Sequence, residues 1–118
     1  PSEGPCGLKV EAPAVSATVR RMEAELEDPP AIARIAADLG LSSRTLEKAF
    51  SRALGVTPGR FFRDLRLQEA RRLVLDSGMS LQEIAVRTGF AAQATFSRAF
   101  AAKFGLSASE LRRRVASV

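Results

Sequence analysis

Residues 35–50 read IAADLGLSSRTLEKAF, and residues 84–100 read IAVRTGFAAQATFSRAF. Each stretch consists of an apolar-patterned segment, a glycine, a short turn and a second patterned segment. Ile35 and Ile84 are 49 positions apart, whereas Phe50 and Phe100 are 50 apart, so the second turn is one residue longer. The repeat predicts two copies of a helix-turn-helix, the motif that lays a helix into the major groove of DNA.

The charge of the chain agrees with a nucleic-acid partner. Its 118 residues carry a net charge of +5, and the isoelectric point of about 10.6 exceeds the value of about 9 that is typical of nucleic-acid-binding domains. Only three of the 18 basic residues are lysines, and arginine is the better donor to guanine edges and phosphate oxygens. The same composition also fits a membrane-surface protein, simple solubility or a GC-rich genome.

Several classes of chemistry are excluded within this chain. It has no histidine and a single cysteine, Cys6, so it holds no intramolecular disulfide, cysteine-rich zinc site or Ser-His-Asp triad. It also lacks a glycine-rich phosphate loop, so we expect no enzyme, no cofactor and no metal. The absence of a long apolar run and of a signal peptide predicts a cytoplasmic protein without a membrane partner. Because the chain begins with Pro1, we expect a processed protein or a part of a longer one.

The remaining pattern predicts an all-α fold of seven helices. Residues 1–13 are rich in proline and glycine and predict a disordered tail or interdomain linker. A helix up to about Glu27 then opens a first helix-turn-helix subdomain over residues 14–57. A long linker helix follows over residues 58–77, and a second helix-turn-helix subdomain covers residues 78–118.

Capping residues support these boundaries. Ser42, Ser80 and Ser107 stand at expected helix starts, and a glutamate follows three residues after each of the last two. Thr57 precedes Pro58, which suits the first position of the long helix. Along that helix we expect Phe61 on the buried stripe and Phe62 partly exposed.

The second half of the chain closely resembles the DNA-binding domain of the AraC/XylS family of bacterial transcription regulators. The resemblance rests on Ile84-Ala85, Gly89-Phe90, residues 96–100 and residues 104–107, and it extends over about residues 15–115. The chain departs from the family pattern at three places. Ala108 replaces a proline, Ala31 replaces a capping Ser or Thr, and Ala94-Thr95 replaces a pair that often contains Ser with His or Tyr.

The resemblance implies that both recognition helices enter major grooves. Independently, a linker helix of about 19 residues measures roughly 28 Å, and successive major-groove segments on one face of DNA lie about 34 Å apart. One chain could then cover an asymmetric site of roughly 20 base pairs. RNA polymerase is expected as a partner, since an acidic patch at Glu23, Glu25, Glu27 and Asp28 could meet it or another domain, or could simply be solvated. The resemblance implies an effector or dimerisation domain on the N-terminal side, although some family members stand alone.

The resemblance places base reading on eight residues, four in each recognition helix. They are Ser43, Arg44, Glu47 and Lys48, and Gln93, Ala94, Ser97 and Arg98. Residues 44, 47 and 48 share one helix face opposite Leu46 and Phe50, and residues 94, 97 and 98 share one opposite Phe96 and Phe100. Arg98 and Arg44 are candidates for bidentate contacts to guanine, Gln93 for adenine and Ala94 for a thymine methyl.

Each of these assignments has a simpler alternative. The arginines could contact phosphate or only water, Gln93 could cap its helix, and Lys48 suits phosphate better than a base. Glu47 could accept from cytosine, or it could pair with Arg44 and Lys48 along the helix.

Contacts to the DNA backbone are expected from helix N-termini and from nearby basic and hydroxyl side chains. These candidates are Ser42, Thr45, Arg60, Arg63, Ser80, Arg87, Ala92, Thr95 and Lys103. The charge run Arg112-Arg113-Arg114 could touch phosphate or interact with the dipole of its own helix.

The rival interpretation of the whole chain is a helical module that binds protein or RNA without sequence-specific duplex binding.

Overall fold

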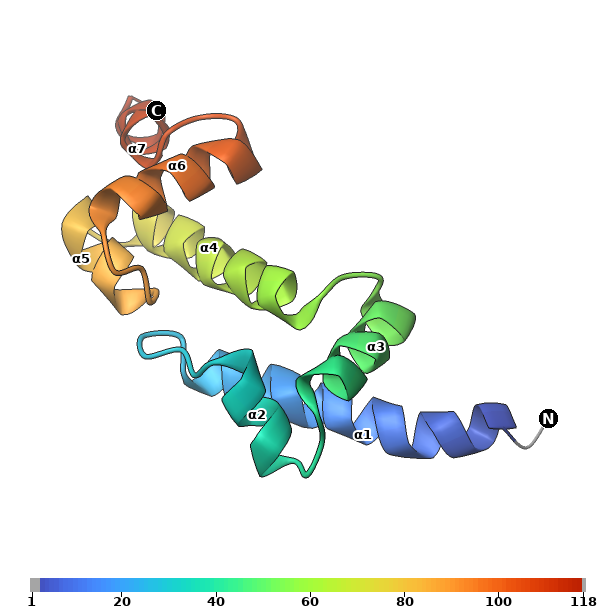
Figure 1. Ribbon diagram of the computed structural model, residues 1–118. Coiled ribbons are helices and arrows are strands. Elements are labelled where there is room, and N and C mark those ends of the chain that lie inside the picture. Colours follow the sequence, from blue (N-terminus) through green and yellow to red (C-terminus); the bar gives the residue numbers. More distant parts are fainter. Residues whose placement is uncertain (1–2, 118) are drawn as a thin grey trace. The chain divides into compact units, whose positions relative to one another are not determined.

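The computed structural model describes residues 3–117, with side chains from residue 12 onward, and all its regular elements are α-helices. The seven helices confirm the all-α prediction (Figure 1). They are α1 (Glu3–Ala24), α2 (Ile32–Asp38), α3 (Ser43–Leu54), α4 (Pro58–Asp76), α5 (Leu81–Arg87), α6 (Gln93–Phe104) and α7 (Ala108–Ala116).

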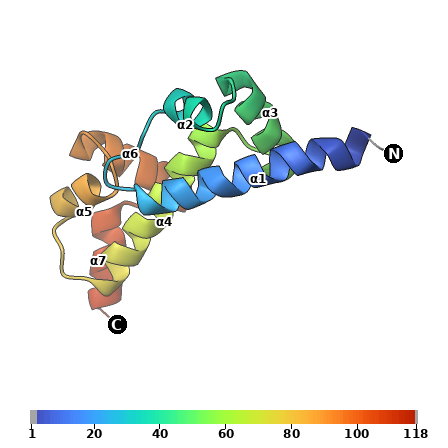
Figure 2. The same cartoon turned by 90° about the horizontal axis from the view of Figure 1, so that it is seen from below.

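The chain forms two compact units. Unit 1 comprises residues 1–25 and 29–63, and unit 2 comprises residues 26–28 and 64–118. In unit 1, α3 packs against α1 and α2; in unit 2, α6 packs against α5 and α7. Helix α4 is unbroken (Figure 1) and contributes residues 58–63 to unit 1 and the remainder to unit 2. Figure 2 shows α3 beside α1 from a second direction.

The first helix begins earlier than the sequence pattern suggested. Residues 3–13, expected to be a disordered tail or linker, are helical, and α1 ends at Ala24 rather than near Glu27. Pro5 lies in the first turn, where the missing N–H would have no partner within the helix. The prediction of a disordered tail or linker from the proline and glycine content is therefore wrong for residues 3–13. The expectation for residues 1–2 lies outside the described residues.

The predicted caps are confirmed. The hydroxyl oxygens of Ser42, Ser80 and Ser107 accept hydrogen bonds from backbone N–H groups three residues later, at 3.1, 3.1 and 3.0 Å. Thr57 caps α4 in the same way, through the N–H of Arg60 at 3.2 Å. Ala31, as expected, offers α2 no side-chain cap.

Both turns of the repeated motif depend on a glycine. Gly40 has φ 74° and Gly89 has φ 81°, in the left-handed region that other residues rarely adopt. Each glycine directly follows the last turn of its helix, as the left-handed C-cap pattern requires. The chain can therefore reverse sharply before each recognition helix.

Each unit has its own apolar core. In unit 1 Met22, Ile35, Leu46 and Phe50 are buried. In unit 2 buried side chains of α4, α5, α6 and α7 form one cluster, which includes Leu67, Val74, Ile84, Phe96 and Phe100.

The burial along α4 corrects one expectation. Phe62 is buried, with 3% exposed, whereas Phe61 is only half-buried. Pro58 and Phe62 in unit 1 are out of helical phase with Leu67 and Val74 in unit 2, because each part of the helix buries the face that its own unit requires. A single apolar stripe was therefore the wrong description of this helix.

Candidate nucleic-acid interface

Helix α3 presents one polar face. Arg44, Glu47 and Lys48 are exposed and Ser43 is half-buried, and these four residues are called the first reading face. The opposite side of α3 is anchored by the buried residues Leu46, Ala49 and Phe50. The apolar spacing that buries α3 thus also determines which side chains remain available to a partner.

Helix α6 repeats this arrangement with different chemistry. Gln93, Ala94 and Arg98 are exposed and Ser97 is half-buried, and these four residues are called the second reading face. The buried residues Phe96, Ala99 and Phe100 correspond to Leu46, Ala49 and Phe50. The two helices therefore share a buried face and differ in their reading faces.

The charged side chains of the reading faces remain available for an external partner. Within residues 12–117, no ion pair joins Glu47 to Arg44 or Lys48, so the pairing considered for Glu47 is not present. Arg98 is exposed on α6 and likewise takes part in no ion pair in that range. Gln93 does not cap α6, whose N-cap residue Ala92 also lacks a side-chain hydrogen bond.

The candidate backbone contacts are less uniform. The Ser42 hydroxyl caps α3 and also donates to Thr45 Oγ1 at 2.9 Å. Arg87 lies 3.8 Å from Glu83, and Lys103 lies 3.6 Å from Asp64. Arg60, Arg63, Ser80, Ala92 and Thr95 are exposed. Arg87 and Lys103 therefore have carboxylate partners within unit 2, and both are exposed like the other five.

Arg112 has a role that the sequence analysis missed. Its guanidinium donates to the backbone carbonyls of Leu73 and Val74 at 3.4 Å, of Ser77 at 3.1 Å and of Met79. These carbonyls lie at the C-terminal end of α4 and just beyond it, where helix carbonyls lack partners within the helix. Arg112 thus caps α4 and joins it to α7, which neither interpretation of the charge run had foreseen.

A sequence signal for such arginines did exist. Arg112 follows Leu111 and stands four residues after the buried Ala108, in register with the inward side of α7. Arg66 likewise stands four residues after the buried Phe62 and four before the buried Ala70, and it donates to the Gly89 carbonyl at 3.0 Å. An arginine in helical register with an apolar stripe packs its stem along apolar surface, and its donors can then reach groups within the fold.

The described residues contain neither a metal-binding cluster nor a membrane-spanning helix. No group of three or more His, Cys, Asp or Glu side chains there could hold a metal ion. In the same part of the chain, none of the helices has the length and apolar character to cross a membrane.

A family model described as a helix-turn-helix domain matches residues 35–114. A solved transcriptional regulator from Chromobacterium violaceum, described as containing an AraC-type DNA-binding domain, superposes with a TM-score of 0.82 at 32% identity, covering 89% of this chain and 94% of that one. The chain belongs to the AraC-type helix-turn-helix family.

Two further relatives extend this result. The HTH-type transcriptional regulator GlxA of Rhizobium meliloti is 40% identical over 108 residues, which are 89% of this chain and 32% of GlxA. The DNA-binding domain of AdpA, solved in complex with a target DNA, is 25% identical with a TM-score of 0.76, covering 88% of this chain and 90% of that one. The AraC-type domain is thus a DNA-binding domain of transcription regulators. This chain spans about a third of the length of the curated relatives that it matches.

Proposed function

We propose that the chain is the DNA-binding part of a bacterial transcription regulator, and that it recognises an asymmetric duplex site with α3 and α6. The observation that carries this proposal is the contrast between the two helices. Their buried faces correspond residue by residue, whereas Arg44, Glu47 and Lys48 on one are replaced by Ala94, Ser97 and Arg98 on the other. Two unlike reading faces require two unlike half-sites.

The roles of the reading residues follow from the donor and acceptor pattern of the major groove. Arg44 and Arg98 each suit a guanine, Gln93 an adenine, Ala94 a thymine methyl and Glu47 a cytosine. Lys48 suits a phosphate, and the hydroxyls of Ser43 and Ser97 can contact either a base or the backbone.

Phosphate contacts are proposed for the backbone-contact candidates, which are residues at or near helix N-termini and basic side chains of α4, α5 and α6. They are Ser42, Thr45, Arg60, Arg63, Ser80, Arg87, Ala92, Thr95 and Lys103. The length of α4, 19 residues or about 28 Å, supports binding in consecutive major grooves, which are about 34 Å apart.

The remaining parts of the proposal concern the full-length protein. We propose an effector or dimerisation domain on the N-terminal side, because the relatives are about three times longer than this chain. RNA polymerase is proposed as a further partner and the bacterial cytoplasm as the location, as expected for a regulator of transcription. No catalytic role is assigned, because the family consists of DNA-binding regulators.

Replacing Arg98 with alanine is expected to remove discrimination at one guanine of the α6 half-site. A bidentate arginine contact provides about 1–3 kcal/mol of discrimination, so the affinity ratio between guanine and any other base should fall by about 5- to 150-fold. Fluorescence anisotropy with duplexes that differ at single positions measures this ratio, and circular dichroism should show unchanged helicity.

Arg113→Ala is the matched control, because it removes the same charge from an exposed position on α7. It should leave every base preference intact. If Arg98→Ala retains the preferences of the wild-type protein, Arg98 is a phosphate contact and not a reading residue.

A further inference from the structure

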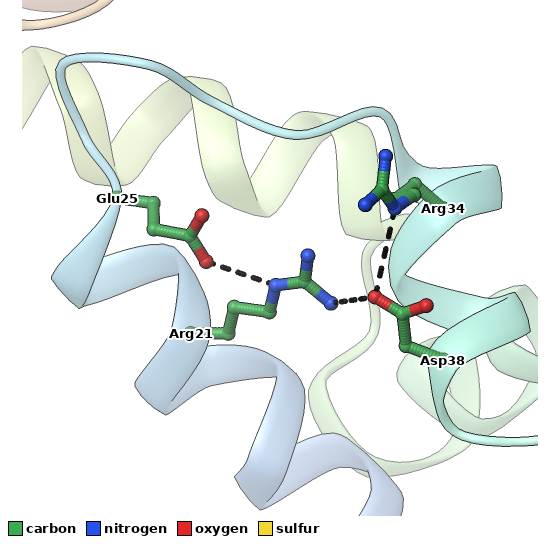
Figure 3. A network of polar contacts seen from close by, with 4 residues as sticks. All are labelled: Arg21, Glu25, Arg34 and Asp38. Carbon is green, nitrogen blue, oxygen red and sulfur yellow. Dashed lines mark hydrogen bonds and ion pairs between the residues drawn. The ribbon is translucent and has the colours of Figure 1, made fainter.

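In each unit, a long helix precedes the helix-turn-helix and carries an arginine that contacts the motif. The contact lies at the end of the motif's first helix or in the turn that follows it. In unit 1, Arg21 of α1 donates through Nη1 to Asp38 Oδ2 at 2.7 Å and through Nε to Glu25 Oε2 at 2.9 Å. Figure 3 shows the Arg21 side chain reaching from α1 between these two carboxylates. Asp38 is the last residue of α2, so the contact fixes the point at which the turn toward α3 begins.

The contact to Asp38 is made mainly by Arg21. Arg34 approaches the same Oδ2 only to 3.8 Å and has 73% of its side chain exposed, whereas the side chain of Arg21 has 28% exposed. The hydrogen bond to Asp38, followed by that to Glu25, raises the pKa of Arg21 above its ordinary value. Arg21 therefore stays charged at every pH at which the fold exists.

In unit 2 the corresponding arginine is Arg66 of α4. Its Nη1 donates to the Gly89 carbonyl in the turn at 3.0 Å, and its guanidinium carbon lies 4.7 Å from the centre of the Phe90 ring. Phe90 in turn packs edge-on against Phe96, with ring centres 5.5 Å apart. Phe96 lies in the first turns of α6, on its buried face. Arg66 is thus connected to the start of α6 through the turn.

We propose that Arg21 and Arg66 are positioning residues for base reading, one for each recognition helix. This inference rests on the proposed function. The helices α2 and α5 have seven residues each, and helices shorter than about 12 residues are marginal alone. Base contacts, in contrast, require the reading side chains to be held within about 0.5 Å of the productive geometry. The two arginines fasten each turn to a long helix and thereby orient α3 and α6.

The two contacts differ in chemistry, which makes them separable by experiment. Arg21 binds a carboxylate, so removing the charge of Asp38 by Asp38→Asn should reproduce the effect of removing Arg21. Arg66 binds a backbone carbonyl and an aromatic ring, neither of which carries a charge. Substitution at either arginine should lower base discrimination at one half-site and leave discrimination at the other unchanged.

The test compares discrimination at the two half-sites. The operator is first selected from random duplexes with the wild-type chain, and two variants of it are made, each with one half-site changed. Arg21→Gln and Asp38→Asn should each lower discrimination at the α3 half-site by at least about 5-fold, the lower end of what one base contact provides. The variant that combines Arg21→Gln and Asp38→Asn should discriminate no less at the α3 half-site than the more impaired of the two single variants, because both changes break the same contact.

Arg66→Gln should lower discrimination by a similar factor at the α6 half-site only. If the Arg66→Gln variant does not fold, Arg66→Lys is tested in its place. Lysine keeps a charged donor but cannot stack a planar group on the Phe90 ring. Two matched controls are Arg20→Gln, an exposed neighbour on α1, and Arg72→Gln, whose partner on α4 is Glu69 at 2.7 Å. Both controls should leave the discrimination at each half-site unchanged.

The outcomes separate the two levels of the argument. If the wild-type chain selects no duplex sequence, the proposed function fails and the inference fails with it. If the wild-type chain discriminates and the folded Arg21 and Arg66 variants discriminate equally well, only the positioning role is refuted. Equal losses at both half-sites, together with lost helicity, would reduce the two arginines to a general structural role and also overturn the proposal.

Discussion

Replacing Arg112 with alanine is expected to lower the free energy of unfolding by about 2–4 kcal/mol, since hydrogen bonds to charged groups contribute about 1.5–3 kcal/mol and several are lost together. The variant removes the guanidinium donors to the carbonyls of Val74, Ser77 and Met79. The Leu73 carbonyl also loses its contact with Arg112 but keeps its hydrogen bonds from the backbone N–H and hydroxyl of Ser77. The C-terminal end of α4 would then lack its cap, and α7 would lose its polar contact with that end. Urea denaturation followed by circular dichroism measures the change.

Arg113→Ala is the control for this experiment. Arg113 is the next residue along α7, is exposed and carries the same charge, so its replacement should change stability by at most about 0.5 kcal/mol. Arg112→Lys should fall between the two, because an ammonium cannot reach several carbonyls in one plane. Equal stability of the Arg112→Ala and Arg113→Ala proteins would show that the cap contributes nothing.

Raising the salt concentration is expected to weaken duplex binding strongly. Each phosphate contact contributes about −0.9 to the slope of log affinity against log salt, so five cationic contacts give about −4.5 and an affinity loss of about 500-fold between roughly 50 and 200 mM salt. The five proposed cations are Lys48, Arg60, Arg63, Arg87 and Lys103. Anisotropy titrations at increasing salt measure the slope.

A single substitution calibrates that slope. Arg63→Ala should reduce it by about 0.9 and weaken all duplex sequences alike, as expected for a phosphate contact. Weak duplex binding that does not respond to salt would contradict the account. It would instead favour the rival interpretation, a helical module that binds protein or RNA.

The features predicted correctly from the sequence are those set by neighbouring residues. The four caps at Ser42, Thr57, Ser80 and Ser107 depend on partners three residues away, and they form as expected. The seven helices were predictable for the same reason, because apolar period, caps and glycine stops agree along the chain. The exposed positions of Arg44, Lys48 and Arg98 also follow from helical phase alone.

The features that were missed depend on residues far apart in the sequence. Arg112 caps carbonyls 33 to 39 residues away, and Arg66 reaches a carbonyl 23 residues away. A local reading of charge shows Arg112 only as part of a basic run. Phe62 was misplaced because α4 contributes to two cores, a property that only tertiary packing determines. The roles of the reading residues stay predictions, because helical phase fixes exposure and not the base contacted.

The central claim is that one chain recognises an asymmetric site with two unlike recognition helices. Selection from a pool of random duplexes, followed by sequencing of the bound fraction, tests it most directly. We predict a motif of two different blocks whose centres are about one helical turn, 10–10.5 base pairs, apart, with guanine enriched in each block. A palindromic motif, a single block or no enrichment would contradict the account.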